Sequence, residues 1–121
     1  MIEMIDAGVG RVTRQLEALG IAQDTIIVYT SDHGDMMGDH GLFLNGCRHY
    51  RGTMQVPMAI NVPGKAALRT NKLSSSIDLG PTLLDLWQVA AFDGIQGHSL
   101  VPLLDDASAT VRDAVLIEDD V

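Results

Sequence analysis

The chain has 121 residues, which is enough for one domain with a hydrophobic core but not for two. Its formal net charge of −8 argues against a nucleic-acid ligand, because proteins that bind phosphate backbones present a basic face. The single cysteine excludes an internal disulfide, and no apolar run approaches the roughly 20 residues that a membrane span requires.

The first half of the chain predicts a helix followed by a strand. Apolar residues at spacings of three and four form one stripe over residues 2–19, and Gly20 is a typical C-terminal stop. Residues 25–30 then form a short β-branched run that is apolar on both faces. Such a strand is typical of the centre of a parallel sheet covered by helices.

The second half of the chain continues the alternation of helices and strands. Asp78 is a candidate helix cap, Pro81 falls in the first turn of that helix, and Trp87 is predicted to pack in its core. The order of elements predicts an α/β fold with a mostly parallel sheet flanked by helices, and residues 1–121 are interpreted as one fragment of a domain. The remaining predicted elements are an irregular loop over 31–55, a strand over 56–62, a helix over 78–90 and a third strand over 114–118.

Acidic residues and histidines concentrate directly after the first predicted strand, in the segment TSDHGDMMGDHG at residues 30–41. In open α/β sheets, ligands bind beyond the carboxyl ends of strands, which is where Asp32 and His33 lie. A carboxylate with an imidazole suits Zn, Mn or Fe, whereas calcium prefers oxygen ligands alone. Two ligands are too few for a complete site, so the spacing equally permits Asp32 as a turn cap and His33 as a surface residue. Met36 and Met37 are expected to pack the loop.

Longer motifs carry a resemblance to a known family. The runs IIVYTSDHGDMMGDHGLF and NGCRHYRGTMQVPMAINVPG, with SSSIDLGPTLLDLW and GHSLVPLL after them, resemble the sulfatase family of the alkaline phosphatase superfamily. The branch they resemble includes choline sulfatases, iduronate-type sulfatases and phosphonate monoester hydrolases. The resemblance implies a partial alkaline-phosphatase-like sandwich in which Asp32 and His33 bind a divalent cation, whether Ca, Mn, Zn or Fe.

The family's nucleophile is a formylglycine made from Cys or Ser in a Cys/Ser-x-Pro/Ala-x-Arg motif far upstream of this segment. Cys47 is followed by Arg-His-Tyr and does not match that motif, so no catalytic residue is expected within the chain and the nucleophile is expected upstream of Met1. The resemblance therefore implies a fragment of a metal-dependent sulfuric-ester hydrolase that carries part of the cation site. The alternatives are an inactive remnant with at most a weak cation site, and a phosphate or phosphonate ester hydrolase of the same superfamily.

The substrate side departs from the family pattern. Relatives usually carry a lysine that contacts the sulfate where this chain has Asn45, and a neutral amide replaces a point charge poorly. Asn45, His40 and Arg48 are the candidate substrate-binding residues, although His40 is also suited to hydrogen bonding within its own loop. Arg51 and Gln55 stand where relatives often have an acid and a base, which suggests either a swapped structural pair or an Arg51 that lends positive charge to the substrate pocket.

The resemblance also implies the partners of the full-length protein. These are a sulfate-ester small molecule or a sulfated sugar. Nucleic acid and membrane are not expected, because the net charge is −8 and no apolar run is long enough for a membrane span. A segment cut from a larger domain exposes surface that the parent buries, so self-association of the isolated chain is expected. The N-terminal residues show no signal peptide, so the chain as given is expected in the cytoplasm.

Overall fold

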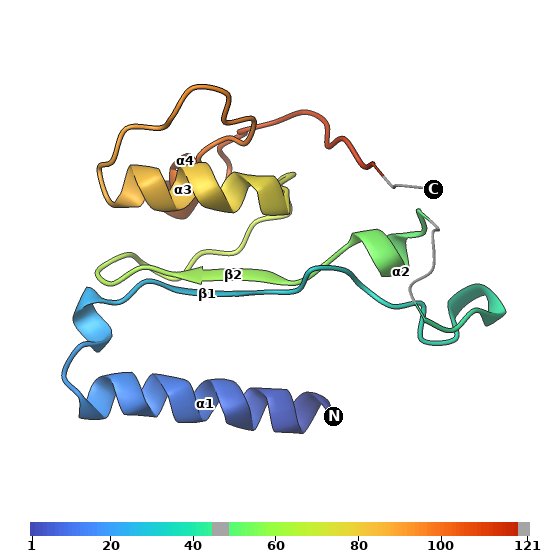
Figure 1. The fold of residues 1–121 in the computed structure, drawn as a ribbon, viewed down its shortest axis with the longest axis horizontal. Helices are drawn as coiled ribbons and strands as arrows, with labels where there is room; N and C mark the ends of the chain where they lie inside the picture. Colours follow the sequence, from blue (N-terminus) through green and yellow to red (C-terminus); the bar gives the residue numbers. More distant parts are fainter. Residues whose placement is uncertain (45–48, 119–121) are drawn as a thin grey trace. The chain divides into compact units, whose positions relative to one another are not determined.

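The computed structural model describes residues 1–44 and 49–118 (Figure 1). The chain divides into two compact units. Unit 1 contains residues 1–29 and 58–65, and unit 2 contains residues 30–57 and 66–121. Within the described ranges, no helix combines the length and the apolar character needed to cross a membrane.

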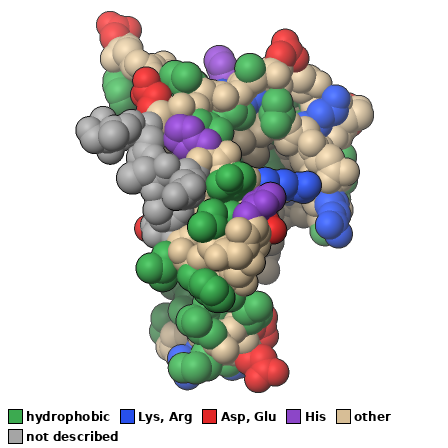
Figure 2. Space-filling model, turned by 90° about the vertical axis from the view of Figure 1, so that its right-hand side faces the viewer, with side chains coloured by type: hydrophobic (Ala, Val, Ile, Leu, Met, Phe, Trp, Pro, Cys, Tyr) green, Lys and Arg blue, Asp and Glu red, His purple; other side chains and the backbone are tan. Residues whose placement is uncertain are grey.

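Helix α1 (Ile2–Ala18) opens unit 1 and ends as its sequence predicts. Gly20 adopts a left-handed φ of 70°, its N–H donates to the Glu17 carbonyl at 3.0 Å, and the Ile21 N–H donates to the Leu16 carbonyl at 3.1 Å. This is the Schellman arrangement, which glycine makes without a steric penalty. The helix contains no buried residue, and exposed hydrophobic side chains are visible on the molecular surface in Figure 2.

Strands β1 (Ile27–Thr30) and β2 (Met58–Asn61) pair to form a two-stranded sheet. The two strands run in opposite directions in Figure 1, so the prediction of a mostly parallel sheet is not confirmed within the described residues. Apolar residues on both faces of a strand predict burial, but they do not determine the direction of its neighbour. That direction depends on how the chain returns, and here residues 31–57 bring it back antiparallel.

Unit 2 holds short helical elements joined by irregular segments. A single helical turn, α2 (Arg51–Met54), lies within the predicted loop, and α4 (Val101–Asp105) forms where the sequence has a Leu-rich turn. The predicted strand over 114–118 is wrong, because these residues pair with no strand of the described chain. An apolar β-branched run becomes a strand only where a partner supplies the other half of its hydrogen bonds.

Helix α3 (Leu79–Leu86) is shorter than the predicted helix over 78–90. Gln88 adopts a left-handed φ of 56°, and the Val89 N–H donates back to the Leu84 carbonyl at 2.8 Å, which closes the helix in the manner of a terminal glycine. Pro81 lies in the first turn, as predicted. Trp87 is 60% exposed, so its assignment to the helix core is wrong.

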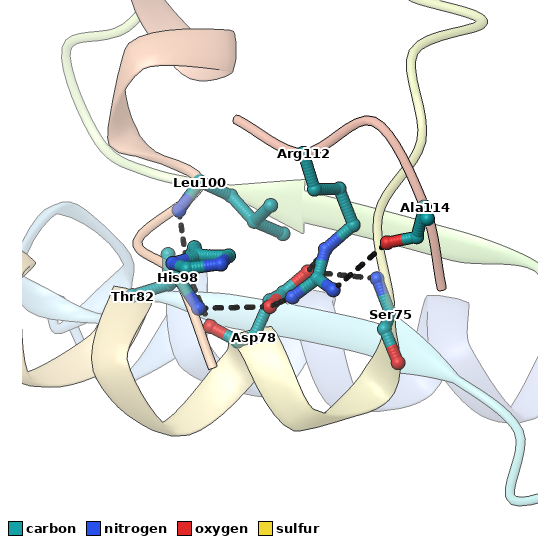
Figure 3. Close-up of polar contacts among 7 residues, drawn as sticks. All are labelled: Ser75, Asp78, Thr82, His98, Leu100, Arg112 and Ala114. Carbon is teal, nitrogen blue, oxygen red and sulfur yellow. Dashed lines mark hydrogen bonds and ion pairs between the residues drawn. The ribbon is translucent and has the colours of Figure 1, made fainter. Parts of the chain in front are cut away.

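The most completely buried side chains of unit 2 belong to Asp78 and Thr82, each 0% exposed (Figure 3). The Asp78 carboxylate accepts hydrogen bonds from the Ser75 N–H at 2.8 Å and the His98 N–H at 2.9 Å, and it pairs with the Arg112 guanidinium. These contacts join residues 75–78 to two later segments of the chain. Asp78 occupies the N-cap position of α3, but its side chain caps no N–H of that helix and is instead the centre of a buried ion pair.

Candidate metal site

Asp32 and His33 lie in a tight turn directly after β1. The Asp32 carboxylate accepts the His33 N–H at 3.0 Å, and the Ser31 hydroxyl lies 2.9 Å from the His33 carbonyl oxygen and 3.3 Å from Asp32 Oδ1. Both side chains are exposed, Asp32 by 84% and His33 by 53%. The turn therefore places a carboxylate and an imidazole side by side, where a solute can reach both.

The imidazole of His33 is oriented by its own backbone. His33 Nδ1 lies 2.8 Å from the Gly34 carbonyl oxygen, and since that oxygen can only accept, the proton belongs on Nδ1. In the neutral ring Nε2 is then the nitrogen that carries the lone pair, and Nε2 lies 3.9 Å from Asp32 Oδ2. A hydrogen bond that fixes the tautomer in this way is typical of metal-binding histidines.

The environment of Asp32 favours its charged form. The hydrogen bond from the His33 N–H is the main influence that lowers the pKa of Asp32 below its ordinary value, with its own N–H and the neighbouring imidazole acting in the same direction. A carboxylate beside an imidazole nitrogen is a donor set for a borderline divalent cation such as Zn²⁺ or Mn²⁺.

No group of three or more His, Cys, Asp or Glu side chains suited to a metal ion occurs in the described part of the chain. The nearby carboxylates are used within the loop instead. Asp35 Oδ1 accepts the Met37 N–H at 2.8 Å, and Asp39 Oδ1 accepts the His40 N–H at 3.1 Å. Asp32 and His33 are therefore a pair that needs ligands from elsewhere to complete a cation site.

The first residue of the chain does not take the place of the expected nucleophile. Met1 is 92% exposed and occupies the N-cap position of α1 without a side-chain hydrogen bond, and its thioether cannot act as the hydroxyl or thiol that the family chemistry requires. A nucleophile upstream of Met1 therefore stays a prediction about the full-length protein.

Of the three candidate substrate-binding residues, only His40 lies within the described residues, since Asn45 and Arg48 fall in the range 45–48 outside them. The His40 ring stacks on the Tyr50 ring with centroids 4.7 Å apart and an interplanar angle of 27°. The side chain remains 58% exposed, so this stack orients the imidazole without covering it. Tyr50 had no signal in the sequence, because a stacked partner ten residues away shows no periodicity.

Arg51 and Gln55 form the contact that the sequence suggested. Arg51 Nε donates to Gln55 Oε1 at 2.6 Å across one turn of α2, in the exposed part of the loop. This agrees with the interpretation of the two residues as a structural pair and uses the Arg51 side chain within its own helix.

The sulfatase family model matches residues 1–89 of this chain. The chain belongs to the sulfatase family. Mouse arylsulfatase K is 38% identical over 105 residues, which cover 86% of this chain and 19% of that relative. Across the first curated relatives, the chain spans only 10% to 24% of their length.

Solved structures agree with the sequence match. The phosphonate monoester hydrolase of Agrobacterium radiobacter has a TM-score of 0.83 at 34% identity over 90% of this chain and 22% of its own. A protein solved in complex with its substrate D-glucosamine-2-N,6-O-disulfate has a TM-score of 0.75 at 36% identity, over 93% of this chain and 23% of its own. Both the sulfatase assignment and the alkaline-phosphatase-like fold are therefore supported, and members of this family depend on a divalent cation.

Proposed function

We propose that this chain is the part of a metal-dependent sulfuric-ester hydrolase that supplies Asp32 and His33 to the divalent-cation site. The observation that carries the proposal is the paired geometry of the two side chains. The Gly34 carbonyl holds the proton on His33 Nδ1, and Nε2 lies 3.9 Å from the ionised Asp32 carboxylate. Zn, Mn and Fe fit this oxygen and nitrogen donor set better than Ca does.

A divalent cation at such a site stabilises negative charge on the oxygens of the transferred group. The residues of this chain hold the cation and orient the substrate. Asp32 contributes charge and His33 contributes an oriented nitrogen to the cation, and His40 contributes an imidazole to the anionic group of the substrate. Asn45 and Arg48 complete the proposed substrate-binding set. The nucleophile and the remaining ligands are assigned to other parts of the full-length protein, because the chain spans about a fifth of mouse arylsulfatase K.

A sulfated sugar is the substrate class that we propose first. The neighbour solved with D-glucosamine-2-N,6-O-disulfate is 36% identical to this chain over nearly its whole length, which supports that class. Phosphonate ester hydrolysis is the second candidate, and the TM-score of 0.83 to a phosphonate monoester hydrolase favours it. Rates of the full-length protein with a sulfated glucosamine and with an aryl phosphonate monoester distinguish the two candidates.

Asn45 bears on whether the full-length protein is active or a remnant. A neutral amide in the position of the usual lysine weakens binding of an anionic group, so Asn45→Lys is expected to raise the hydrolysis rate of the full-length protein. An unchanged rate would remove this argument for a degenerate enzyme.

The expectation that the chain is cytoplasmic stays a prediction, which fractionation of the source cells checks.

The cation site can be tested on the chain itself. Mn²⁺ broadens NMR signals of nuclei close to it, so low Mn²⁺ concentrations should selectively broaden the signals of Asp32 and His33. Asp32→Asn should abolish the effect. Asp35→Asn is the matched control, because it removes an equivalent charge that is used within the loop, and it should preserve the broadening. Broadening that persists in Asp32→Asn, or that is lost in Asp35→Asn, would instead indicate a diffuse acidic surface and would contradict the proposed site.

A further inference from the structure

Two backbone segments of unit 2 cross at unusually close range directly beside Asp32 and His33. The Gly34 N–H donates to the Thr53 carbonyl oxygen at 2.8 Å. A Cβ atom added to Gly34 would collide with the Gly52 carbonyl oxygen and would lie 3.2 Å from Thr53 Cα. Only glycine therefore permits this crossing at position 34.

Buried side chains hold both sides of the crossing. Met36 and Thr53 are each 2% exposed, and the Thr53 hydroxyl donates to the Tyr50 carbonyl at 2.8 Å. A Cβ atom added to Gly52 would lie 3.4 Å from the Asp35 carbonyl oxygen, 3.5 Å from Met36 Sδ and 3.7 Å from Met36 Cα, which are ordinary contact distances. The two sides of the crossing therefore differ: Gly34 has no room for a methyl group, and Gly52 has enough.

The geometry points to Gly34 and Met36 as positioning residues for cation binding by Asp32 and His33. The inference rests on the proposed function, since it concerns the same site. The two ligand side chains are themselves exposed, so burial does not orient them. Their placement comes from the backbone at Gly34, whose carbonyl holds the His33 ring and whose N–H is tied to Thr53.

The crossing also links the two sides of the candidate site. Gly34 follows the metal pair, and the segment that it crosses begins at Tyr50, which stacks on His40. Coupling between binding and conformation is reciprocal. If the hydrogen-bonded crossing strengthens cation binding, a bound cation must also stabilise the crossing. Bound Zn²⁺ should therefore slow hydrogen exchange of the Gly34 amide.

The test measures Zn²⁺ affinity from the ring nitrogen shifts of His33 in the whole chain. Gly34→Ala should weaken Zn²⁺ binding by about tenfold or more, the usual effect of losing a group that orients a metal ligand. Gly52→Ala is the matched control, since the same methyl group finds ordinary contacts there, and its affinity should stay within about twofold of wild type. Zn²⁺ should slow Gly34 amide exchange in wild type and in Gly52→Ala.

Each outcome separates the positioning role from the site itself. Wild-type affinity in Gly34→Ala would overturn the positioning role and leave the proposed cation site standing. A wild-type His33 that ignores Zn²⁺, or an unchanged response in Asp32→Asn, would overturn the site and the positioning role with it. If Gly34→Ala does not fold, Gly52→Val provides the test, because its larger side chain presses on Met36; a folded Gly52→Val chain with wild-type affinity would refute the inference.

Discussion

Replacing the buried carboxylate of Asp78 should destabilise the chain more than any exposed substitution. In wild type, one carboxylate oxygen receives the His98 N–H and one guanidinium N–H, and the other receives the Ser75 N–H and the Arg112 Nε–H (Figure 3). The amide of Asp78→Asn offers one acceptor oxygen. Whichever way it turns, one backbone N–H and one guanidinium N–H lose their acceptor, and the charge of Arg112 loses its partner.

The magnitude follows from the burial of both partners. Asp78 is 0% exposed and Arg112 11% exposed, so water cannot replace what is lost. An unsatisfied buried donor costs about 1–3 kcal/mol, and breaking a buried ion pair by removing one partner costs about 3–5 kcal/mol in total. We expect Asp78→Asn to lower the free energy of unfolding by about 3–5 kcal/mol.

Urea unfolding followed by circular dichroism measures this change. Asp85→Asn is the matched control, because Asp85 is an exposed acid of the same helix whose carboxylate accepts the Ser99 hydroxyl at the surface. It should cost less than about 1 kcal/mol. A loss in Asp78→Asn no larger than that of the control would refute the reasoning from buried partners.

The same carboxylate should make stability depend on acid pH. Burial, the largest influence, raises the pKa of Asp78, but hydrogen bonds from the His98 N–H, Arg112 and the Ser75 N–H outweigh it and hold the pKa below its ordinary value. A carboxyl whose pKa is lower in the folded state stabilises the fold above its unfolded pKa and loses that contribution as pH falls. Asp78→Asn should therefore flatten the loss of stability below about pH 4, and Arg112→Met should make that loss smaller, because it removes contacts that hold the folded pKa of Asp78 below its unfolded value.

Three further predictions concern other parts of the chain. Thr82→Val should cost about 1–3 kcal/mol in urea unfolding, because the buried Leu100 N–H loses its acceptor at 2.9 Å; the exposed Thr70→Val is the control. Removing the pair with Arg51→Ala and Gln55→Ala should give a coupling of about 0.2–0.5 kcal/mol in a double-mutant cycle, and no coupling would contradict the pairing. The exposed hydrophobic residues of α1 lead us to expect self-association, which a concentration-independent monomer in sedimentation would contradict.

The elements that were predicted correctly are those that depend on residues close together in the sequence. The stop at Gly20 and the short apolar run of β1 are examples, since a left-handed glycine and β-branched residues act within a few positions. The end of α3 was missed because Gln88, rather than a glycine, takes the left-handed conformation. The antiparallel sheet was missed because the direction of β2 depends on the path of the whole connection between the strands.

Among the polar residues, too, neighbours in the sequence gave a signal, whereas partners far apart in the sequence did not. The residue types at Asp32 and His33 indicate cation chemistry because carboxylate and imidazole are adjacent after a strand. Arg112 gave no such signal, since its partner Asp78 lies 34 residues earlier and the ion pair exists only once the fold forms. Met36 packs the loop as predicted, although only the structure shows that it lies beside Gly52. Met37 is 79% exposed, so the prediction that it also packs the loop is wrong.

The contrast between the ligand pair and its support explains why glycines matter so much here. The proposed ligands Asp32 and His33 are both exposed, so burial of their side chains does not hold them in place. Precision must then come from the backbone that carries them, and a hydrogen-bonded crossing at Gly34, with Met36 buried beneath it, provides that precision. The acidic and histidine residues carry the chemistry that we propose for this segment, and its glycines determine the backbone geometry.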